Sequence, residues 1–134
     1  MYLLSFLLAG AGQAGEWMVV SGHSISSKVE TSLVARAARS RETVTVNDVQ
    51  AAEDWLPNPL LPETRAEMAV PIIQKGEVIG VLDVQEDQID GLDESDAGSL
   101  RSLANQVAVA LANAHLFKET VQAKEEDELA KQEI

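Results

Sequence analysis

Residues 65–85 read RAEMAVPIIQKGEVIGVLDVQ, and this stretch decides the fold. Two apolar runs, Ala66–Gln74 and Val78–Gln85, are separated by Lys75-Gly76-Glu77, a short connection that contains glycine. Such a pattern is typical of a β-hairpin. Because side chains alternate between the two faces of a strand, one face of this hairpin is uniformly apolar. We expect a helix to cover that face, which carries Met68, Val70, Ile72, Val78, Leu82 and Val84.

The opposite face of the hairpin is smaller and more polar. By the same alternation it carries Glu67, Ala69, Pro71, Val81, Asp83 and Gln85. A carboxylate in the middle of a strand must be partly enclosed, so we expect hydrogen bonds or the Arg65 guanidinium to satisfy Asp83.

The flanking segments indicate further strands and one short helix. Alternating β-branched residues predict a strand over Thr43–Val49, followed by a proline-rich loop over Ala51–Thr64. Upstream, Val29, Leu33, Val34 and Ala37 fall at helical spacing. Two strands, Tyr2–Ala9 and Trp17–Val20, are expected at the start of the chain, joined by Gly10–Gly15 and followed by a turn at residues 21–24.

A long helix is expected at the end of the chain. Asp93 is suited to its N-cap and Asp96 to its third position, because both match the positive end of the helix dipole. The helix is expected to run to the end of the chain. Its apolar positions alternate steps of three and four, as in a coiled-coil seam: Leu100, Leu103, Val107, Ala110, Ala114, Phe117 and Val121.

Composition narrows the possible functions. The chain has 134 residues, enough for one domain, and no cysteine, which excludes disulfides, thiolate metal sites and cysteine nucleophiles. The net charge of −12 opposes binding to nucleic acid or to an anionic membrane. The apolar stretch 1–15 has no cation before it and is too short to span a bilayer. We therefore expect a cytoplasmic protein.

Five blocks of sequence carry a resemblance to a known family. In chain order they are Val46–Val49, Trp55–Asn58, Arg65–Ile72, Val78–Gln85 and Leu103–Ala114. Together they resemble a GAF domain, the small-ligand sensor module of signalling proteins, which is similar in architecture to PAS domains. The resemblance implies an α+β fold with a central antiparallel sheet of about five strands. A long C-terminal helix would cover one face, and a helix with irregular loops the other.

The resemblance also implies how the chain is organised. We expect a GAF-like domain over residues 1–117, in which the first helix usual in the family has no counterpart. Residues 118–134 would be a polar continuation of the last helix or a signalling linker. Family members often continue from this point into a kinase, cyclase or transcriptional domain.

The ligand site of the resembling family lies on the more polar sheet face, below the loop that follows the third strand. Carried to this chain, the candidates for ligand binding are Asp48, Trp55, Arg65, Glu67 and Asp83. A structural role is the alternative, in which the charged residues hold the loop and Trp55 belongs to the core. No catalytic residue and no metal ligand is expected. Covalent bilin attachment needs a cysteine, so no such cofactor is expected, and the ligand is unknown.

The expected function is a non-catalytic sensory domain that passes ligand or partner binding through its last helix, as a homodimer. The dimer interface would use Leu103, Val107, Ala110, Ala114, Phe117 and Val121. A ligand-free dimerisation module is one alternative, and a small enzyme using carboxylates such as Glu67 and Asp83 is another. The enzyme is disfavoured because no nucleophile pair or metal set accompanies those carboxylates.

Overall fold

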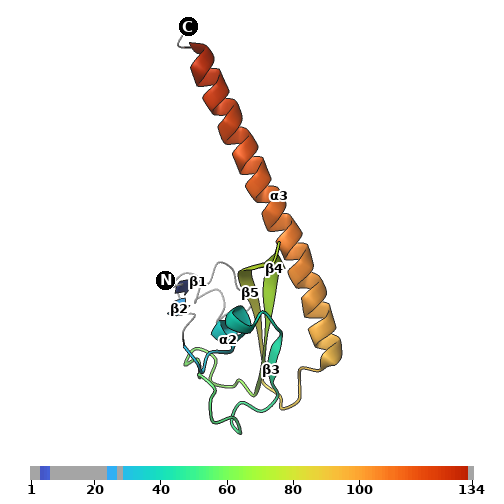
Figure 1. Ribbon diagram of the computed structural model, residues 1–134. Coiled ribbons are helices and arrows are strands. Elements are labelled where there is room, and N and C mark those ends of the chain that lie inside the picture. The colour runs from blue at the N-terminus through green and yellow to red at the C-terminus, as the bar shows by residue number, and fades with distance from the viewer. Residues whose placement is uncertain (1–3, 7–23, 27–28, 133–134) are drawn as a thin grey trace.

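The computed structural model describes residues 4–6, 24–26 and 29–132. The elements in this part of the chain are β1 (Leu4–Phe6), β2 (Ser24–Ser26), α2 (Leu33–Ser40), β3 (Val44–Val46), β4 (Ala66–Gln74), β5 (Glu77–Glu86) and α3 (Glu94–Gln132). Figure 1 shows a small sheet with α2 against one face and α3 along the other. The architecture is therefore α+β, as predicted.

The strands form two separate antiparallel sheets. One holds β3, β4 and β5 in that order, and the other pairs β1 with β2. Within the described residues, a single sheet of about five strands is thus not confirmed. The predicted strand Trp17–Val20 lies outside these residues. The turn predicted over residues 21–24 was wrong at Ser24, which belongs to β2 and pairs with Phe6. Strands pair through backbone N–H and C=O groups, which serine has like any other residue except proline.

The β4–β5 hairpin agrees closely with the sequence pattern. β4 has the predicted bounds, and β5 exceeds the predicted run by one residue at each end. Gln74 pairs with Glu77, which leaves Lys75 and Gly76 as a two-residue turn. Both turn residues have positive φ, 50° for Lys75 and 79° for Gly76. Two-residue hairpin turns need such angles because the turn must match the right-handed twist of the strands.

The face of the sheet covered by α3 forms the larger core. Met68, Val70 and Ile72 are buried there against the small residues Ala97, Ala104 and Ala108 of α3. Leu82, Val84, Leu100 and Val107 complete this cluster. Val78 departs from the prediction, because a β-bulge between Ile72 and Ile73 shifts the register and pairs Val78 with Ile73.

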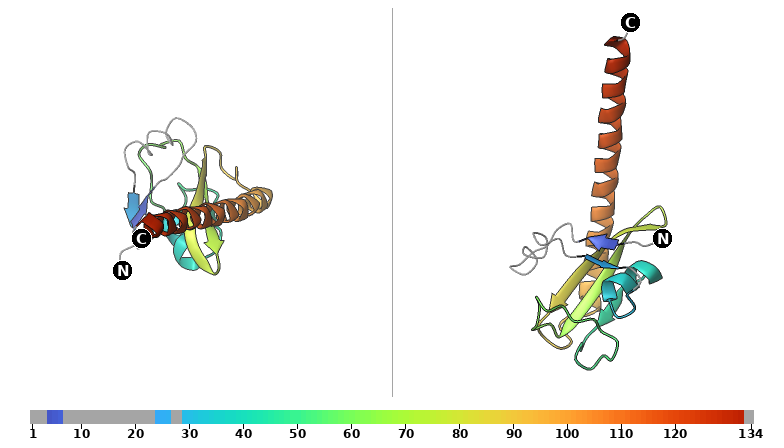
Figure 2. Two further views of the ribbon diagram at one scale, coloured as in Figure 1. Left: turned by 90° about the horizontal axis from the view of Figure 1, so that it is seen from above. Right: turned by 90° about the vertical axis from the view of Figure 1, so that its left-hand side faces the viewer.

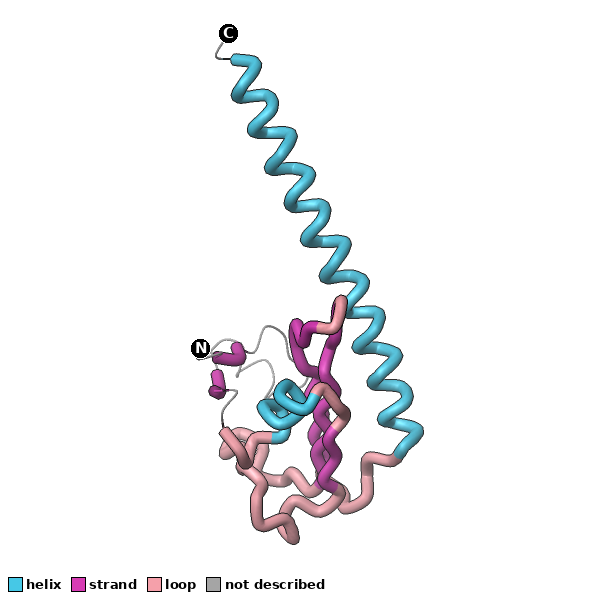
Figure 3. Tube along the Cα trace, in the orientation of Figure 1, coloured by secondary structure: helices cyan, strands magenta, loops and turns pink. Residues whose placement is uncertain are grey.

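The other face of the sheet is covered by α2 and by the long loop between β3 and β4, drawn as the lower pink tube in Figure 3. Leu33 and Ala37 of α2 are buried against Ala69. Val44, Val46, Trp55 and Val81 pack around them. The loop therefore folds back on the core, and this second, smaller core lies on the sheet face that carries Glu67 and Asp83.

The helix α2 starts later than the apolar spacing suggested. Its first residue is Leu33, because Ser32 caps it by accepting a hydrogen bond from the Ala35 backbone N–H at 3.2 Å. Val29 therefore lies before the helix. Arg41 ends it in the left-handed conformation with φ 62°.

The N-terminus of α3 has the predicted cap. The Asp93 carboxylate accepts from the Asp96 N–H at 2.9 Å, and the Asp96 carboxylate accepts from the Asp93 N–H at 2.8 Å. This is a reciprocal capping box built from two aspartates. The hydrogen bond from the Asp96 backbone lowers the pKa of Asp93.

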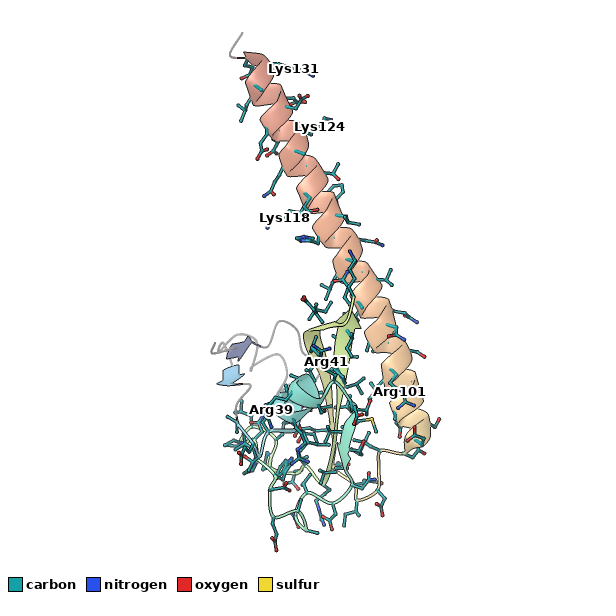
Figure 4. The ribbon with its side chains drawn as sticks, in the orientation of Figure 1. Arg39, Arg41, Arg101, Lys118, Lys124 and Lys131 are labelled. Atoms are coloured by element: carbon teal, nitrogen blue, oxygen red, sulfur yellow. The ribbon has the colours of Figure 1, made fainter. Side chains whose placement is uncertain are left out.

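α3 runs well past the sheet, as the right-hand view of Figure 2 shows. Every side chain from Asn113 to Gln132 is exposed. Lys118, Lys124 and Lys131 lie on this projecting part, whereas Arg101 lies beside the sheet (Figure 4). In the described residues, no helix is long and apolar enough to cross a membrane.

Only some residues of the expected coiled-coil seam pack on the sheet, and the others are exposed. Leu100 and Val107 pack against the sheet. Phe117 is 72% exposed and Leu103 is 46% exposed. The remaining seam positions, Ala110, Ala114 and Val121, are also exposed.

Candidate functional site

The candidate site lies on the sheet face that α2 covers, where the hairpin places three polar side chains together. Glu67 of β4 is directly opposite Gln85 of β5, and Asp83 is opposite Ala69. Residues 67 and 83 are therefore diagonal neighbours on one face, close enough for long side chains to meet. The predicted alternation on these two strands is confirmed here.

Glu67 is the centre of the site. Only 5% of its surface is exposed, which is unusual for a carboxyl group. The indole Nε1 of Trp55 donates a hydrogen bond to its Oε2 at 2.6 Å. Trp55 comes from the loop between β3 and β4 and is half-buried. One loop residue and one strand residue, both predicted as candidates, are therefore joined.

The second partner of Glu67 is the Asp83 carboxyl group. The pKa of Glu67 is raised from 4.5 to about 9, mainly by burial and also by the hydrogen bond and negative charge of Asp83, while the Trp55 hydrogen bond opposes the rise. Burial also raises the pKa of Asp83, against hydrogen bonds from Glu67 and Gln85. Because the negative charge of Asp83 raises the pKa of Glu67 in addition to burial, Glu67 is the member of the pair that keeps its proton at neutral pH.

The network continues through two residues that the sequence did not indicate as candidates. The Gln85 Nε2 donates to Asp83 Oδ2 at 3.1 Å. Thr64, which is 7% exposed, donates from its hydroxyl to Gln85 Oε1 at 2.7 Å. The position of Gln85 opposite Glu67 could have indicated its role, but no sequence signal marks Thr64 as its partner.

The other two candidates, Asp48 and Arg65, form a separate ion pair. The Arg65 Nη2 and Asp48 Oδ1 atoms are 3.8 Å apart, and both side chains are about one third exposed. The Arg65 Nε is buried without a hydrogen-bond partner. Arg65 therefore pairs with Asp48 and not with Asp83, so the prediction that its guanidinium would satisfy Asp83 was wrong. The alternative prediction, that hydrogen bonds satisfy Asp83, is confirmed by the bond from Gln85.

One end of the network reaches a shallow surface depression of about 270 Å³. It lies between the loop residues 60–64 and the end of β5 at residues 85–87, so Thr64 and Gln85 line it. Its walls are mostly apolar. Among the described residues, no group of three or more acidic or histidine side chains is arranged to hold a metal ion.

A family model for the GAF domain matches residues 6–112 of the chain. The chain belongs to the GAF family. The match covers the sheet, α2, the loop that carries Trp55 and the part of α3 that packs on the sheet. All five candidate residues lie inside this GAF domain.

Solved structures that resemble this GAF domain include enzymes and signalling domains. The free methionine-R-sulfoxide reductase of Neisseria meningitidis, solved with its substrate, is 30% identical, with TM-score 0.56 over 63% of this chain and 48% of that chain. The type II enzyme of Thermoplasma acidophilum is 27% identical, with TM-score 0.57 over 63% of this chain and 57% of that chain.

A third structure is the GAF domain of a phosphoenolpyruvate-protein phosphotransferase from Coxiella burnetii. It is 20% identical, with TM-score 0.64 over 75% of this chain and 60% of that chain, so its likeness shows the fold alone. The chain covers less than two thirds of the length of each of the three structures. No curated protein sequence matches it.

Proposed function

We propose that this GAF domain is a non-catalytic cytoplasmic sensor that binds a small amine-bearing molecule at the Glu67–Asp83 pair. The observation that carries the proposal is the pair itself, a buried carboxyl group joined to an exposed one. No arginine or lysine of the described residues forms an ion pair with either carboxyl. The site therefore keeps a negative charge that a ligand can satisfy.

An ammonium group suits this charge better than an anion does. It brings N–H donors to carboxylate oxygens, and such charge-assisted hydrogen bonds are about twice as strong as neutral ones. The site lies beside apolar residues, Val46 and Val81, on the same sheet face. A ligand with one ammonium group and a short apolar part fits this combination.

The reductases of similar structure support this ligand class. Their names state that they act on free methionine sulfoxide, which is a free amino acid and carries an ammonium group. We extend from them only the chemical class, a free amino acid or a related small amine.

Two observations support a sensor over an enzyme. The 134 residues contain no cysteine, so the chain offers no thiol that could reduce a sulfoxide. A proton divided unequally between two carboxyls also occurs in acid–base enzymes, but the described site offers no nucleophile or metal set beside it.

The output path in this proposal is α3. Its base packs on β4, the strand that carries Glu67, and its distal half projects from the domain. The exposed seam positions Ala110, Ala114, Phe117 and Val121 repeat in steps of four and three, which a second helix of the same kind matches. We therefore propose a homodimer through α3, followed by a kinase, cyclase or transcriptional domain in the parent protein.

Replacing Asp83 with alanine tests the ligand site. A binding role predicts an intact fold and loss of the amine, whereas a structural role predicts destabilisation by about 1–3 kcal/mol with the ligand retained. Native mass spectrometry gives the bound mass, and thermal denaturation gives the stability of the same variant. Glu77→Ala, an exposed position at the other end of β5, is the matched control.

The test has two further outcomes. A destabilised D83A protein that still carries its ligand would refute the site. If the unmodified protein carries no small molecule and binds neither L-methionine sulfoxide nor methylammonium, a ligand-free dimerisation module becomes the better assignment.

A further inference from the structure

The α3 helix presents exposed apolar side chains on two flanks, one on each side of the residues that pack on the sheet. The first flank is the exposed seam that ends at Phe117 and Val121. The second flank is formed by four residues, which we call the Val109 row: Val109, Ala112, Leu116 and Ala123. Because successive helix residues are rotated by about 100°, Leu116 and its neighbour Phe117 lie on different flanks.

The Val109 row is open to solvent. Val109 is 61% exposed and Leu116 is 59% exposed, and the Ala123 side chain is exposed as well. Single apolar residues are common on protein surfaces and need no explanation. Here, however, steps of three, four and seven residues keep the side chains in one line over about four turns of helix. A continuous apolar line is what one helix offers to another.

The distal end of the Val109 row is bordered by acidic residues. On a helix surface, the neighbours of a side chain lie three and four residues away. For Ala123 these neighbours include Glu119, Glu126 and Asp127. No lysine or arginine stands three or four residues from any member of the row. The row therefore combines an apolar line with negative charge at one end.

Two of these acids form pairs within the helix, and both pairs are weak. The His115 Nε2 atom is 3.1 Å from Glu119 Oε1, and the Lys131 Nζ atom is 3.0 Å from Asp127 Oδ2. All four side chains are more than 60% exposed. Exposed pairs one turn apart on a helix contribute little, so a cation of a partner can replace them.

The seam on the first flank has a different charge pattern. The neighbours of Val121 include Lys118, Lys124 and Glu125, which carry both signs of charge. Two copies of the seam can therefore pair opposite charges with each other. In a parallel symmetric pair formed through the Val109 row, Glu119 and Asp127 would instead meet the same acids of the second copy, which is unfavourable. The charge pattern assigns the seam to a second copy and the Val109 row to a basic partner.

We propose that the Val109 row is the docking surface for a basic amphipathic helix of a partner protein. The partner helix would place apolar residues, repeating in steps of three and four, on Val109 and Leu116. Its lysines or arginines would lie against Glu119, Glu126 and Asp127. From Val109 to Asp127 the surface is about 27 Å long, which a helix of about 18 residues covers. This inference goes beyond the proposed sensor and needs neither its ligand nor its dimer.

A synthetic peptide of about 20 residues can serve as the probe. Its leucines repeat in steps of three and four, its lysines flank the leucines in one half, and a fluorescent label reports binding by anisotropy. The full chain should bind the peptide saturably. The Kd should rise with added salt, because salt screens exposed charge pairs. A scrambled peptide of the same composition controls for simple attraction of cations to a chain of net charge −12, and it should not bind.

Two adjacent substitutions on α3 separate the two flanks. Leu116→Glu places a charge in the Val109 row and should weaken peptide binding by about tenfold or more, while self-association measured by sedimentation stays unchanged. Phe117→Glu adds the same charge on the other flank, so it should leave peptide binding unchanged. Leu116 is 59% exposed and Phe117 is 72% exposed, so neither change disturbs the core.

A matched pair of triple variants tests the role of charge. Neutralising the acids of the row, with Glu119→Gln, Glu126→Gln and Asp127→Asn, should raise the Kd for the basic peptide by about tenfold. The control removes three exposed acids outside α3: Glu42→Gln, Glu53→Gln and Glu63→Gln. Since both variants change the net charge equally, the control should keep the Kd of the unmodified chain if position matters.

Four results would overturn the proposal. The first is the absence of saturable binding of the basic peptide, and the second is equal binding of the scrambled peptide. The third is equal effects of the two triple variants, which would reduce the interaction to net charge. The fourth is a dimer that dissociates in the Leu116→Glu variant and persists in Phe117→Glu, because the Val109 row would then belong to a second copy. None of these results bears on the amine site at Glu67 and Asp83.

Discussion

Glu67→Gln should change how the stability of the domain depends on pH. In the native protein the glutamine would resemble protonated Glu67, because its carbonyl oxygen can accept from Trp55 and its amide N–H can donate to Asp83. The unmodified protein must instead hold a proton on Glu67 that the unfolded chain releases above pH 4.5. That difference in bound protons sets the slope of stability against pH.

The sign follows from the raised pKa. Between about pH 4.5 and 9 the native state binds one proton more than the unfolded state, so its stability falls as pH rises. Each pH unit is worth about 1.4 kcal/mol. From pH 6 to pH 8 the unmodified protein should lose about 3 kcal/mol from this group, which corresponds to a decrease in Tm of about 10 °C for a domain of this size.

Thermal denaturation at pH 6, 7 and 8, with urea unfolding to confirm the free energies, measures this slope. E67Q should show a shallower profile, to which the raised pKa of Asp83 still contributes, and should exceed the unmodified protein by about 3 kcal/mol at pH 7, since residue 67 then needs no proton from water. Glu77→Gln, at an exposed position, should keep the steep profile. Parallel profiles for E67Q and the unmodified protein would refute the assignment of the proton to Glu67.

The remaining predictions concern α3. Ala114→Glu should convert a dimer into a monomer in sedimentation at micromolar concentration, because it places a charge in the exposed seam. Ala123→Glu lies about two and a half turns further along, on the opposite side of the helix, and should leave the dimer intact. Equal behaviour of the two variants would contradict the dimer proposal. Asp93→Ala should lower the free energy of unfolding by about 1 kcal/mol through loss of the capping box. Asp87→Ala, an exposed position before the helix, is its control in urea denaturation, and an equal loss there would contradict the capping role.

The hairpin and the cap of α3 could be predicted because each depends on local sequence. The turn at Lys75-Gly76 and the alternation in β4 fix which side chains share a face, and this alone placed Glu67 and Asp83 together. The cap depends only on two aspartates three residues apart. Predictions of this kind need no knowledge of distant segments.

The parts that sequence could not predict depend on long-range packing. Arg65 pairs with Asp48 rather than Asp83 because the chain after β3 runs antiparallel beside Arg65, with Val49 N–H bonded to the Arg65 carbonyl oxygen. Thr64 reaches Gln85 only because the loop returns to the sheet. The β2 strand was missed because Ser24 and Ser26 carry no strand signal of their own.

The projecting half of α3 also acts as a lever. With a rise of about 1.5 Å per residue, the exposed part beyond Asn113 is roughly 30 Å long. A tilt of about 10° at the base would move the tip by roughly 5 Å, about one turn of helix. The base rests on the sheet through alanines 97, 104 and 108, together with Leu100 and Val107. Over the roughly 16 Å of helix from Ala97 to Ala108 the same tilt is a shift of about 3 Å, so a movement of that size beside the sheet would arrive at the far end of the helix enlarged almost twofold.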